Sequence, residues 1–285
     1  MLGGRIVAHL LNQPDVVVRV LARPAAPADD SRRQGMDNLR AQGAHIAVGD
    51  LSDPDSLARV TAGIDVVVSA VQGRRETLLD GQVALARAAK ANGAHRFIPS
   101  DFAIDLFHAP PGAPQFDLRR TADAAVAETG LDVVHVLSGA FMDGFLDPDA
   151  SLVFDVRAGT ANYWGDGDER FNLTLVDDTA HFTAKLAVDP GVQPGVYAIS
   201  GTETSFNGIA DDVEAVIGRP LQRRQIATLE DLQAAIAAKA DAWAALGEWY
   251  FVSMLTTPPL RDLQNDRYPG VSPTALTDYL RRIIQ

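Results

Sequence analysis

The sequence predicts an α/β protein in which a doubly wound parallel sheet is followed by a smaller mixed α/β domain. Two observations carry this prediction. In the first half of the chain, short apolar, β-branched runs alternate with helical stretches at the spacing of βαβ units. After Phe141 the pattern changes to hairpin-like alternation and separate helices. We therefore expect one domain over residues 1–147 and a smaller, partly interleaved domain over residues 148–285.

Near-continuous apolar runs mark the expected strands of the first domain. Strands that helices cover on both faces lose the alternation of half-exposed strands. The expected strands are Val16–Ala22, His45–Asp50, Ile64–Val71, His95–Ser100 and Leu131–Ser138.

The helices between these strands have recognisable ends. Asp53 is the expected N-cap of a helix that starts with Pro54 and stops at Gly63. Two more helices, each closed by a glycine, are expected at Glu76–Asn92 (Gly93) and Phe116–Thr129 (Gly130).

The smaller domain is expected to contain hairpins and three helices. Ser151–Asp178 alternates like paired strands, with Ala158-Gly159-Thr160 and Gly165-Asp166-Gly167 as turns. The expected helices are Asn207–Ile217, Leu229–Gly247 and Thr274–Ile284.

Composition limits the classes of function. The 285 residues are 47% hydrophobic, which is enough for a sizeable core. A net charge of −12 argues against sequence-independent binding of nucleic acid and against an anionic membrane surface. No apolar run approaches the roughly 20 residues that span a bilayer. We expect a small-molecule partner, with no nucleic acid and no membrane.

The cysteine and histidine content argues against a metal centre. The absence of cysteine excludes disulfides and thiolate ligands, and it favours a reducing cytoplasm. The six histidines lack the spacing of a helical metal site, so we expect no metal. The chain is rich in alanine and arginine but has only three lysines, Lys90, Lys185 and Lys239, which favours a bacterial source.

In open parallel sheets, ligands bind beyond the carboxyl ends of the strands. Arg23 follows the first expected strand, where an arginine suits the extra phosphate of NADP and an acidic residue would suit NAD. The alternative is an ordinary surface arginine. Asp50 and Leu51 follow the second strand; Asp50 either accepts from an adenine amino group or serves a turn.

Small and aromatic residues follow the later strands. Ala70, Val71 and Gln72 would let a flat cofactor approach the backbone, or they reflect tight strand-to-loop packing. The remaining candidates, which either wall a cofactor or substrate pocket or belong to a domain core, are Ser100, Phe102, Ser138, Gly139 and Phe141.

Other catalytic patterns are absent from the sequence. No Gly-x-Ser-x-Gly elbow occurs, which argues against a serine hydrolase. The pairs Asp177-Asp178 and Asp211-Asp212 are sequence neighbours whose side chains point different ways, so we interpret them as caps or solvated faces.

Several motifs together resemble the NmrA-like and isoflavone-reductase-like branch of the atypical short-chain dehydrogenases. They are Leu2-Gly3-Gly4-Arg5-Ile6-Val7, GDLSD (49–53), GIDVVVSAV (63–71), RFIPSDF (96–102), FDLRR (116–120), SGAFMDGF (138–145), LVDDTAHF (175–182), GRPL (218–221) and RYPGVSPTALTDYL (267–280). The resemblance covers nearly the whole chain.

This resemblance implies a Rossmann-type NAD(P)-binding domain over residues 1–147 and a C-terminal substrate domain. It implies an NADP(H)-preferring reductase of a small carbonyl, quinone or enone, and a homodimer. The alternative is a non-catalytic dinucleotide-binding redox sensor. Gly3 matches the last glycine of the family's phosphate loop. In the family, a lysine that serves in proton transfer stands at the position of Arg119. Arg119 would hold a phosphate, ribose or carbonyl oxygen there; the alternative is a solvated helix residue.

Arginine titrates too high to shuttle protons near neutrality, and the sequence offers no clear substitute. The family pattern also begins with a strand and two further glycines. We expect Met1 to be an internal methionine of a longer natural protein. In the order 3-2-1-4-5-6, a sheet without its first strand has a slot at its centre or closes in another way.

Overall fold

The computed structural model describes residues 2–23, 30–147 and 151–284. The chain forms two compact units that interleave along the sequence. Unit 1 comprises residues 1–101, 118–136 and 180–196, and unit 2 comprises residues 102–117, 137–179 and 197–285. The division into functional domains at residue 147 stays a prediction.

Unit 1 is built on parallel strands. One 2-stranded sheet pairs β1 (Arg19–Ala22) with β2 (His45–Val48) in parallel. A 4-stranded sheet has the order β10-β5-β4-β3, in which β3–β4 and β4–β5 are parallel. Its strands are β3 (Val66–Val68), β4 (Arg96–Ile98), β5 (Asp132–Leu137) and β10 (Gly195–Ala198). Each of the five strands expected in this half of the chain is confirmed, at shorter length.

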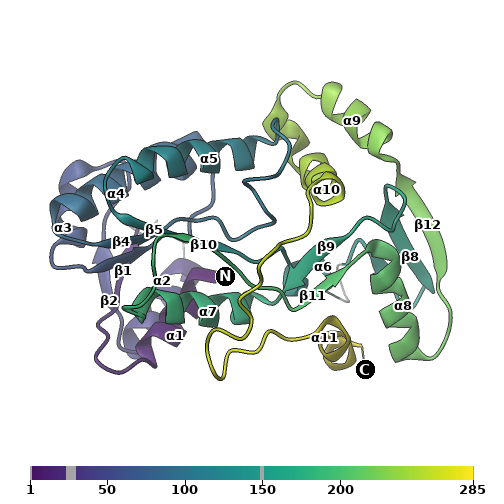
Figure 1. The fold of residues 1–285 in the computed structure, drawn as a ribbon, viewed down its shortest axis with the longest axis horizontal. Coiled ribbons are helices and arrows are strands. Elements are labelled where there is room, and N and C mark those ends of the chain that lie inside the picture. The colour runs from purple at the N-terminus through teal and green to yellow at the C-terminus, as the bar shows by residue number, and fades with distance from the viewer. Residues whose placement is uncertain (1, 24–29, 148–150, 285) are drawn as a thin grey trace. The chain divides into compact units, whose positions relative to one another are not determined.

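Helices cover both faces of this parallel structure, which makes it doubly wound (Figure 1). The helices α3, α4 and α5 lie on one side, and α1, α2 and α7 on the other. Their bounds are α1 (Leu2–Leu11), α2 (Asp30–Ala41), α3 (Pro54–Thr61), α4 (Gln82–Ala91), α5 (Pro114–Ala127) and α7 (Val176–Val188). A π-helical segment (Glu76–Gly81) leads into α4. The core between α3, α4, α5 and β4 includes the buried side chains Leu57, Val83, Phe97 and Val126.

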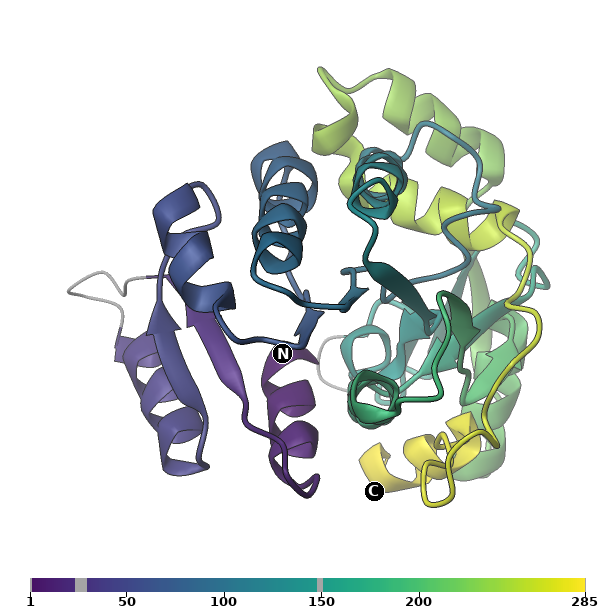
Figure 2. The same ribbon diagram turned by 60° about the vertical axis from the view of Figure 1, so that its left-hand side comes forward.

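The sheet of unit 1 is split where the sequence predicts a slot. Within the described residues, no strand pairs with both β1 and β3, and the two strands belong to separate sheets. Instead, Arg19 at the start of β1 donates from Nη1 to the carbonyls of Val60 (2.9 Å) and Ala62 (2.7 Å) at the end of α3. Figure 2 shows β1, in purple, beside α1 and the blue β2. In the described residues, β1 and β3 therefore do not pair with each other across the expected slot.

The predicted helix ends of unit 1 are confirmed. Asp53 caps α3, its side chain accepting from the backbone N–H of Asp55 at 3.1 Å, and Pro54 occupies the first turn. Past the ends of α3, α4 and α5, Gly63, Gly93 and Gly130 take positive φ, which favours glycine.

Unit 2 contains two 3-stranded sheets and an aromatic core. The sheet orders are β11-β9-β6 and β12-β8-β7. The strands are β6 (Ala140–Phe141), β7 (Phe154–Asp155), β8 (Thr160–Trp164), β9 (Phe171–Thr174), β11 (Thr202–Thr204) and β12 (Gln222–Ala227). The helices are α6 (Met142–Phe145), α8 (Phe206–Ile217), α9 (Leu229–Ala237), α10 (Leu246–Thr256) and α11 (Leu276–Ile283), with a 3-10 turn at Ala242–Ala245. The rings of Trp164, Phe171 and Phe206 pack together in the core.

Two predictions about unit 2 are wrong. The turn at residues 158–160 does join antiparallel β7 and β8, but the Gly165–Gly167 turn joins strands of different sheets, because β8 pairs with β12 and β9 with β11 and β6. The single helix expected over Leu229–Gly247 ends at Ala237. Asp241 then caps a new turn by accepting from the backbone N–H of Trp243 at 2.8 Å.

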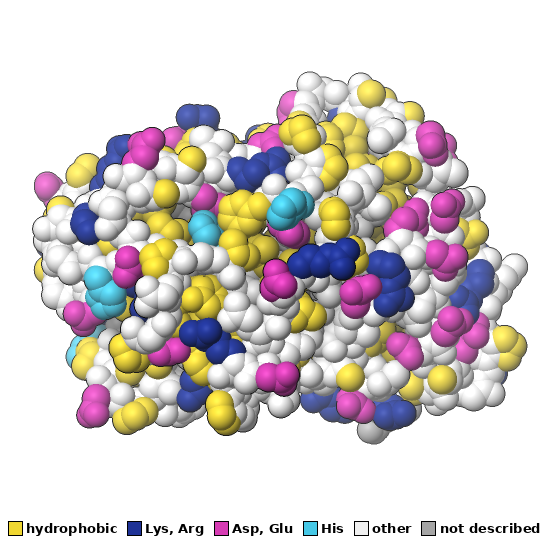
Figure 3. All heavy atoms as spheres, in the orientation of Figure 1, with side chains coloured by type: hydrophobic (Ala, Val, Ile, Leu, Met, Phe, Trp, Pro, Cys, Tyr) yellow, Lys and Arg dark blue, Asp and Glu magenta, His cyan; other side chains and the backbone are white. Residues whose placement is uncertain are grey.

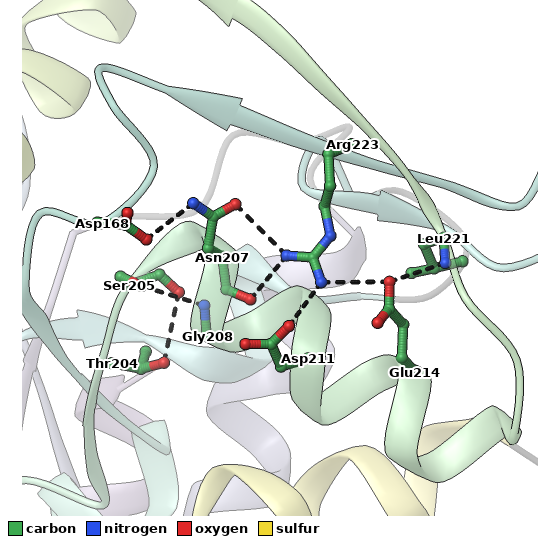
Figure 4. Close-up of polar contacts among 9 residues, drawn as sticks. All are labelled: Asp168, Thr204, Ser205, Asn207, Gly208, Asp211, Glu214, Leu221 and Arg223. Atoms are coloured by element: carbon green, nitrogen blue, oxygen red, sulfur yellow. Dashed lines mark hydrogen bonds and ion pairs between the residues drawn. The ribbon is translucent and has the colours of Figure 1, made fainter.

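Arg223 fastens β12 to α8 (Figure 4). Its Nη1 donates to the carbonyl of Asn207 at 2.9 Å, and its Nη2 lies 2.6 Å from Asp211 and 3.2 Å from Glu214. The carboxylate of Glu214 also accepts from the backbone N–H of Leu221 at 2.8 Å. The network is an internal ion-pair cluster that links the strand to the helix.

Within the described residues, the structure contains no helix that is both long and apolar enough to span a membrane. Acidic and basic side chains are interspersed over the face shown in Figure 3.

Candidate active site

The predicted cofactor residues of unit 1 lie at one edge of the parallel strands. Arg23 directly follows β1, Asp50 and Leu51 follow β2, residues 70–72 follow β3, and Ser100 follows β4. These strands belong to two sheets, β1-β2 and β10-β5-β4-β3, and residues near their carboxyl ends, Leu21, Leu51 and Val67, pack against one core. The binding of a cofactor by these residues stays a prediction.

Helix α1 begins beside this edge. A Cβ added to Gly3 would lie 3.4 Å from the Cβ of Ala70, so the first turn of α1 is close to the end of β3. The first N–H groups of a helix lack intrahelical partners and attract anions. Next to Ala70, the Oγ of Ser69 is buried without a hydrogen-bond partner. The start of α1 beside the end of β3 fits a phosphate-bearing ligand.

Arg23 and Asp50 are close enough to influence each other. The side chain of Arg23 is exposed, and its charge contributes to lowering the pKa of Asp50. The larger cause of this lowered pKa is hydrogen bonding from Ser52, whose N–H and hydroxyl donate to Asp50 Oδ1 at 2.8 Å and 2.7 Å. The turn role of Asp50 is therefore observed, and one of its carboxylate oxygens is engaged in it.

Ser100 ties the ends of β3 and β4 to α5. Its hydroxyl donates to the carbonyl of Val71 at 2.7 Å, and its N–H donates to Gln82 Oε1 at 3.0 Å. Arg119 on α5 donates from Nε to the Ser100 carbonyl at 2.6 Å. Arg119 is only 8% exposed, so the alternative of a solvated helix residue is wrong.

Four predicted residues, Phe102, Ser138, Gly139 and Phe141, belong to unit 2. Gly139 has φ +69, and a Cβ there would lie 2.2 Å from the carbonyl oxygen of Asn172. The Ser138 carbonyl accepts from the Thr174 hydroxyl at 2.6 Å. The strand after β5 therefore packs directly on β9.

Gly139 also lines a small cavity of unit 2, about 10 Å³ in volume, which has room for one water molecule. The other lining residues are Ile104, Asp105, Phe171, Asn172, Met254 and residues 257–260. Phe145, in contrast, packs in the aromatic core, 6.1 Å from Phe206 and 6.4 Å from Phe171 between ring centroids. Phe145 therefore belongs to the core of unit 2.

Sequence reasoning missed a buried cluster behind Arg119. Asp101 follows Ser100, Asp123 lies one helical turn after Arg119 on α5, and His135 lies on β5. His135 Nδ1 lies 2.7 Å from Asp101 Oδ2 and 4.0 Å from Asp123 Oδ2. Within the described residues these three form the one group whose atoms are close enough to hold a metal ion. The expectation of no metal stays a prediction.

Burial governs the ionisation of Asp123. Loss of water around its carboxyl and, next, the nearby charge of Asp101 raise the pKa from 3.8 to about 9, against the opposing charge of Arg119. One signal in the sequence points to part of this cluster: Arg119 and Asp123 are four residues apart, so a helix places both on one face. Their burial depends on the packing of α5 against the sheet, which the local pattern does not reveal.

Comparison with known proteins agrees with this architecture. The model of the NmrA-like family matches residues 1–254. Pinoresinol reductase 1 of Arabidopsis thaliana is 27% identical, over 99% of this chain and 94% of its own. A bifunctional pinoresinol-lariciresinol reductase of Linum usitatissimum is 25% identical, over 98% of this chain and 94% of its own.

A solved structure described as AtPrR2 with NADP+ and (+)pinoresinol has a TM-score of 0.83. It is 26% identical and matches 99% of this chain and 95% of its own. These named relatives are plant proteins, so they give no support to the expected bacterial source. The predicted resemblance and the Rossmann-type fold are confirmed, and the chain belongs to the NmrA-like family.

Proposed function

We propose that this protein is an NADP(H)-dependent reductase of a small organic molecule that carries a carbonyl, quinone or enone. One observation carries the proposal: unit 1 gathers Arg23, the start of α1, the small residues after β3, and Arg119 with Ser100 around one edge of its parallel strands. This edge is where open α/β sheets bind dinucleotides.

The residues at this edge suit NADPH, which supplies a hydride when it is bound. Arg23 would hold the 2′-phosphate, because a guanidinium matches phosphate geometry and charge. The N-terminus of α1, near Gly3, would face the pyrophosphate. Residues 70–72 would lie beside the cofactor, since small side chains let a flat molecule approach the backbone.

Arg119 would orient the reacting groups. Its guanidinium is fixed through the Ser100 carbonyl at 2.6 Å, and its charge persists at all working pH values. A fixed cation can stabilise the negative charge that develops on a substrate oxygen. In this role Arg119 polarises the substrate and donates no proton.

The alternative, a dinucleotide-binding sensor without catalysis, is less favoured, because the similar proteins named above are reductases. We expect unit 2 to contribute the substrate-binding surface, as a C-terminal substrate domain would. The cavity beside Gly139, about 10 Å³, holds a single water molecule and is not that surface. Similarity to proteins that act on pinoresinol makes lignan-like aromatic molecules a reasonable addition to a substrate panel.

The test is a titration with NADPH and NADH followed by turnover assays. We expect NADPH to bind more tightly than NADH, and we expect oxidation of NADPH with at least one quinone, enone or lignan, followed by its near-ultraviolet absorbance. Tight binding without oxidation by any substrate of the panel would favour the sensor. Failure to bind either nucleotide would contradict both functions.

A further inference from the structure

Asp101, Asp123 and His135 form a buried polar cluster from three segments of unit 1: the loop after β4, the helix α5 and the strand β5. One ligand atom from each lies within 4.8 Å of the others. Asp101 is 0% exposed and Asp123 is 5% exposed. The His135 side chain is 14% exposed and is the most accessible member.

Three of the four carboxyl oxygens of this cluster lack a hydrogen-bond partner. Asp101 Oδ2 lies 2.7 Å from His135 Nδ1. The other oxygen of Asp101 and both oxygens of Asp123 are buried and have no hydrogen-bond partner. Two ionised carboxylates in this position would be strongly unfavourable, because buried charges need partners and like charges repel. One added proton removes a charge and supplies a donor between the two carboxyls.

We propose that Asp101 and Asp123 share one proton at neutral pH, that His135 connects this proton to solvent, and that the cluster is the proton source behind Arg119. The catalytic part of this proposal rests on the proposed reductase function. The part that assigns a shared proton to Asp101 and Asp123 does not depend on that function.

The electrostatics of the neighbourhood agree with this assignment. The charges that act on Asp123 are those of Asp101 in the adjoining loop and Arg119 on its own helix, and the ring of His135 on β5 lies 4.0 Å away. Burial and Asp101 raise the pKa of Asp123 to about 9, and Arg119 counteracts only part of this effect. Asp123 is therefore the member of the cluster that keeps its proton at pH 7.

The cluster supplies what Arg119 lacks. When a carbonyl carbon receives a hydride from reduced nicotinamide, its oxygen requires one proton. Arg119 keeps its protons, because a guanidinium is not deprotonated at working pH values. In the proposed step the Asp123 O–H bond breaks, the substrate O–H bond forms, and the resulting carboxylate regains a proton from solvent through His135 and Asp101. The atoms and charges balance without a further reactant.

Infrared spectroscopy tests the proton directly, in the whole protein without cofactor. We expect the wild-type protein at pH 7 to show the C=O stretch of a buried carboxylic acid, which D123N lacks. The control variant is E128Q, which removes an exposed carboxylate directly after α5. It should keep the band. Absence of the band from the wild type, or its persistence in D123N, would overturn the proposal.

A second arm asks whether a cation occupies the cluster instead. Titration of the metal-free protein with Zn2+ or Mn2+ should give no stoichiometric binding that depends on Asp123. Binding of either ion that is lost in both D123N and H135Q would identify a metal site and would overturn the shared proton.

The catalytic half needs a kinetic test. With a substrate that the wild type reduces, D123N should lower kcat by about 100-fold, the typical contribution of a general acid, while KM and NADPH affinity stay within a factor of about three. The pH dependence of the remaining rate should also change. An unchanged kcat and pH profile would refute proton supply by Asp123. Failure of the wild type to reduce any substrate would instead count against the proposed function, and the infrared result would still decide the proton.

Discussion

Arg119 donates from Nε to the backbone carbonyl oxygen of Ser100 at 2.6 Å, and this bond joins the helix α5 to the loop after β4. Ser100 in turn donates to the carbonyl of Val71, so α5, β4 and β3 are connected through one serine. The charge of Arg119 is therefore held at the carboxyl end of β4, beside the proposed cofactor residue Ser100. A side chain fixed in this way loses little freedom when it contacts a ligand.

We expect R119A to lower kcat by at least about 10-fold, because the fixed positive charge beside the reacting groups is lost. Loss of a charge-assisted bond to the nearly buried Ser100 should also lower the free energy of unfolding by about 1–3 kcal/mol. R119K keeps a charge and should recover part of the activity. Steady-state kinetics and urea unfolding measure both effects, with the exposed R87A as control. Equal kcat values for R119A and R87A would contradict this role.

The raised pKa of Asp123 predicts a specific pH dependence of stability. Between pH 3.8 and about 9 the folded protein holds a proton on Asp123 that the unfolded chain has lost. More protons are then bound to the folded state, so the free energy of unfolding decreases as pH rises, by about 1.4 kcal/mol per pH unit for one proton. The contribution of this proton to the free energy of unfolding is complete below pH 3.8 and is lost as pH approaches 9.

D123N cannot titrate at this position, so this part of the slope should disappear. Urea unfolding of wild type, D123N and E128Q at several pH values between about 5 and 8 measures the difference. We expect D123N to gain stability relative to wild type as pH rises, and E128Q to follow the wild type. Parallel curves for wild type and D123N would mean that Asp123 is ionised in the folded protein.

Local sequence patterns predicted the parts of the fold that depend on local physics. Apolar β-branched runs become strands, and Asp53 with Pro54 starts a helix, because each preference is set by adjacent residues. The pairing of β8 depends on which distant strand offers a complementary edge, so the turn at Gly165–Gly167 was misinterpreted. The break after Ala237 was missed because its alanine-rich surroundings favour helix on both sides.

The candidate site divides in the same way. The positions of Arg23, Asp50 and Ala70 at or just beyond the carboxyl ends of parallel strands could be predicted, because each follows an apolar run in the sequence; their role in binding a cofactor stays a prediction. The buried cluster could not be predicted. Asp101 and His135 are 34 residues apart, and only the packing of β4, β5 and α5 brings them within 2.7 Å. Burial, which raises the pKa of Asp123, is likewise a property of the packed structure.

Arg96 on β4 supports the end of α7. It is 3% exposed and donates to backbone carbonyls in the last turn of α7 and just beyond it, those of Leu186, Ala187, Asp189 and Val192. Carbonyls at a helix end lack intrahelical donors and favour a cation.

We expect R96A to lower the free energy of unfolding by about 3 kcal/mol or more, because several buried acceptors lose their donor. Thermal and urea unfolding measure it. The exposed R59A should change stability by less than about 0.5 kcal/mol, and a similar result for R96A would contradict the role.

Gly139 is predicted to be irreplaceable in unit 2. Alanine there would be strained at φ +69, and its Cβ would lie 2.2 Å from the carbonyl oxygen of Asn172. Since Asn172 also accepts from the backbone N–H of Leu260 at 2.7 Å, the cavity wall would have to move. We expect G139A to lose several kcal/mol of stability. At Gly144 an added Cβ meets nothing within 4 Å, so G144A is the matched control. A melting temperature of G139A equal to that of the wild type would contradict this prediction.

Arg23 is the residue on which the preference for NADP(H) depends. It is exposed at the end of β1, and its charge acts on Asp50 after β2, so it stands at the proposed cofactor edge. A charge-assisted bond to a phosphate is worth about 1.5–3 kcal/mol, which corresponds to about 10- to 100-fold in affinity. We expect R23A to weaken NADPH binding by this factor and to leave NADH binding nearly unchanged, because NADH lacks the 2′-phosphate. Fluorescence titration of both nucleotides measures the ratio, with the exposed R40A as control. An equal loss for NADPH and NADH would assign Arg23 to the ribose or the fold, and no loss for either would make it a surface arginine.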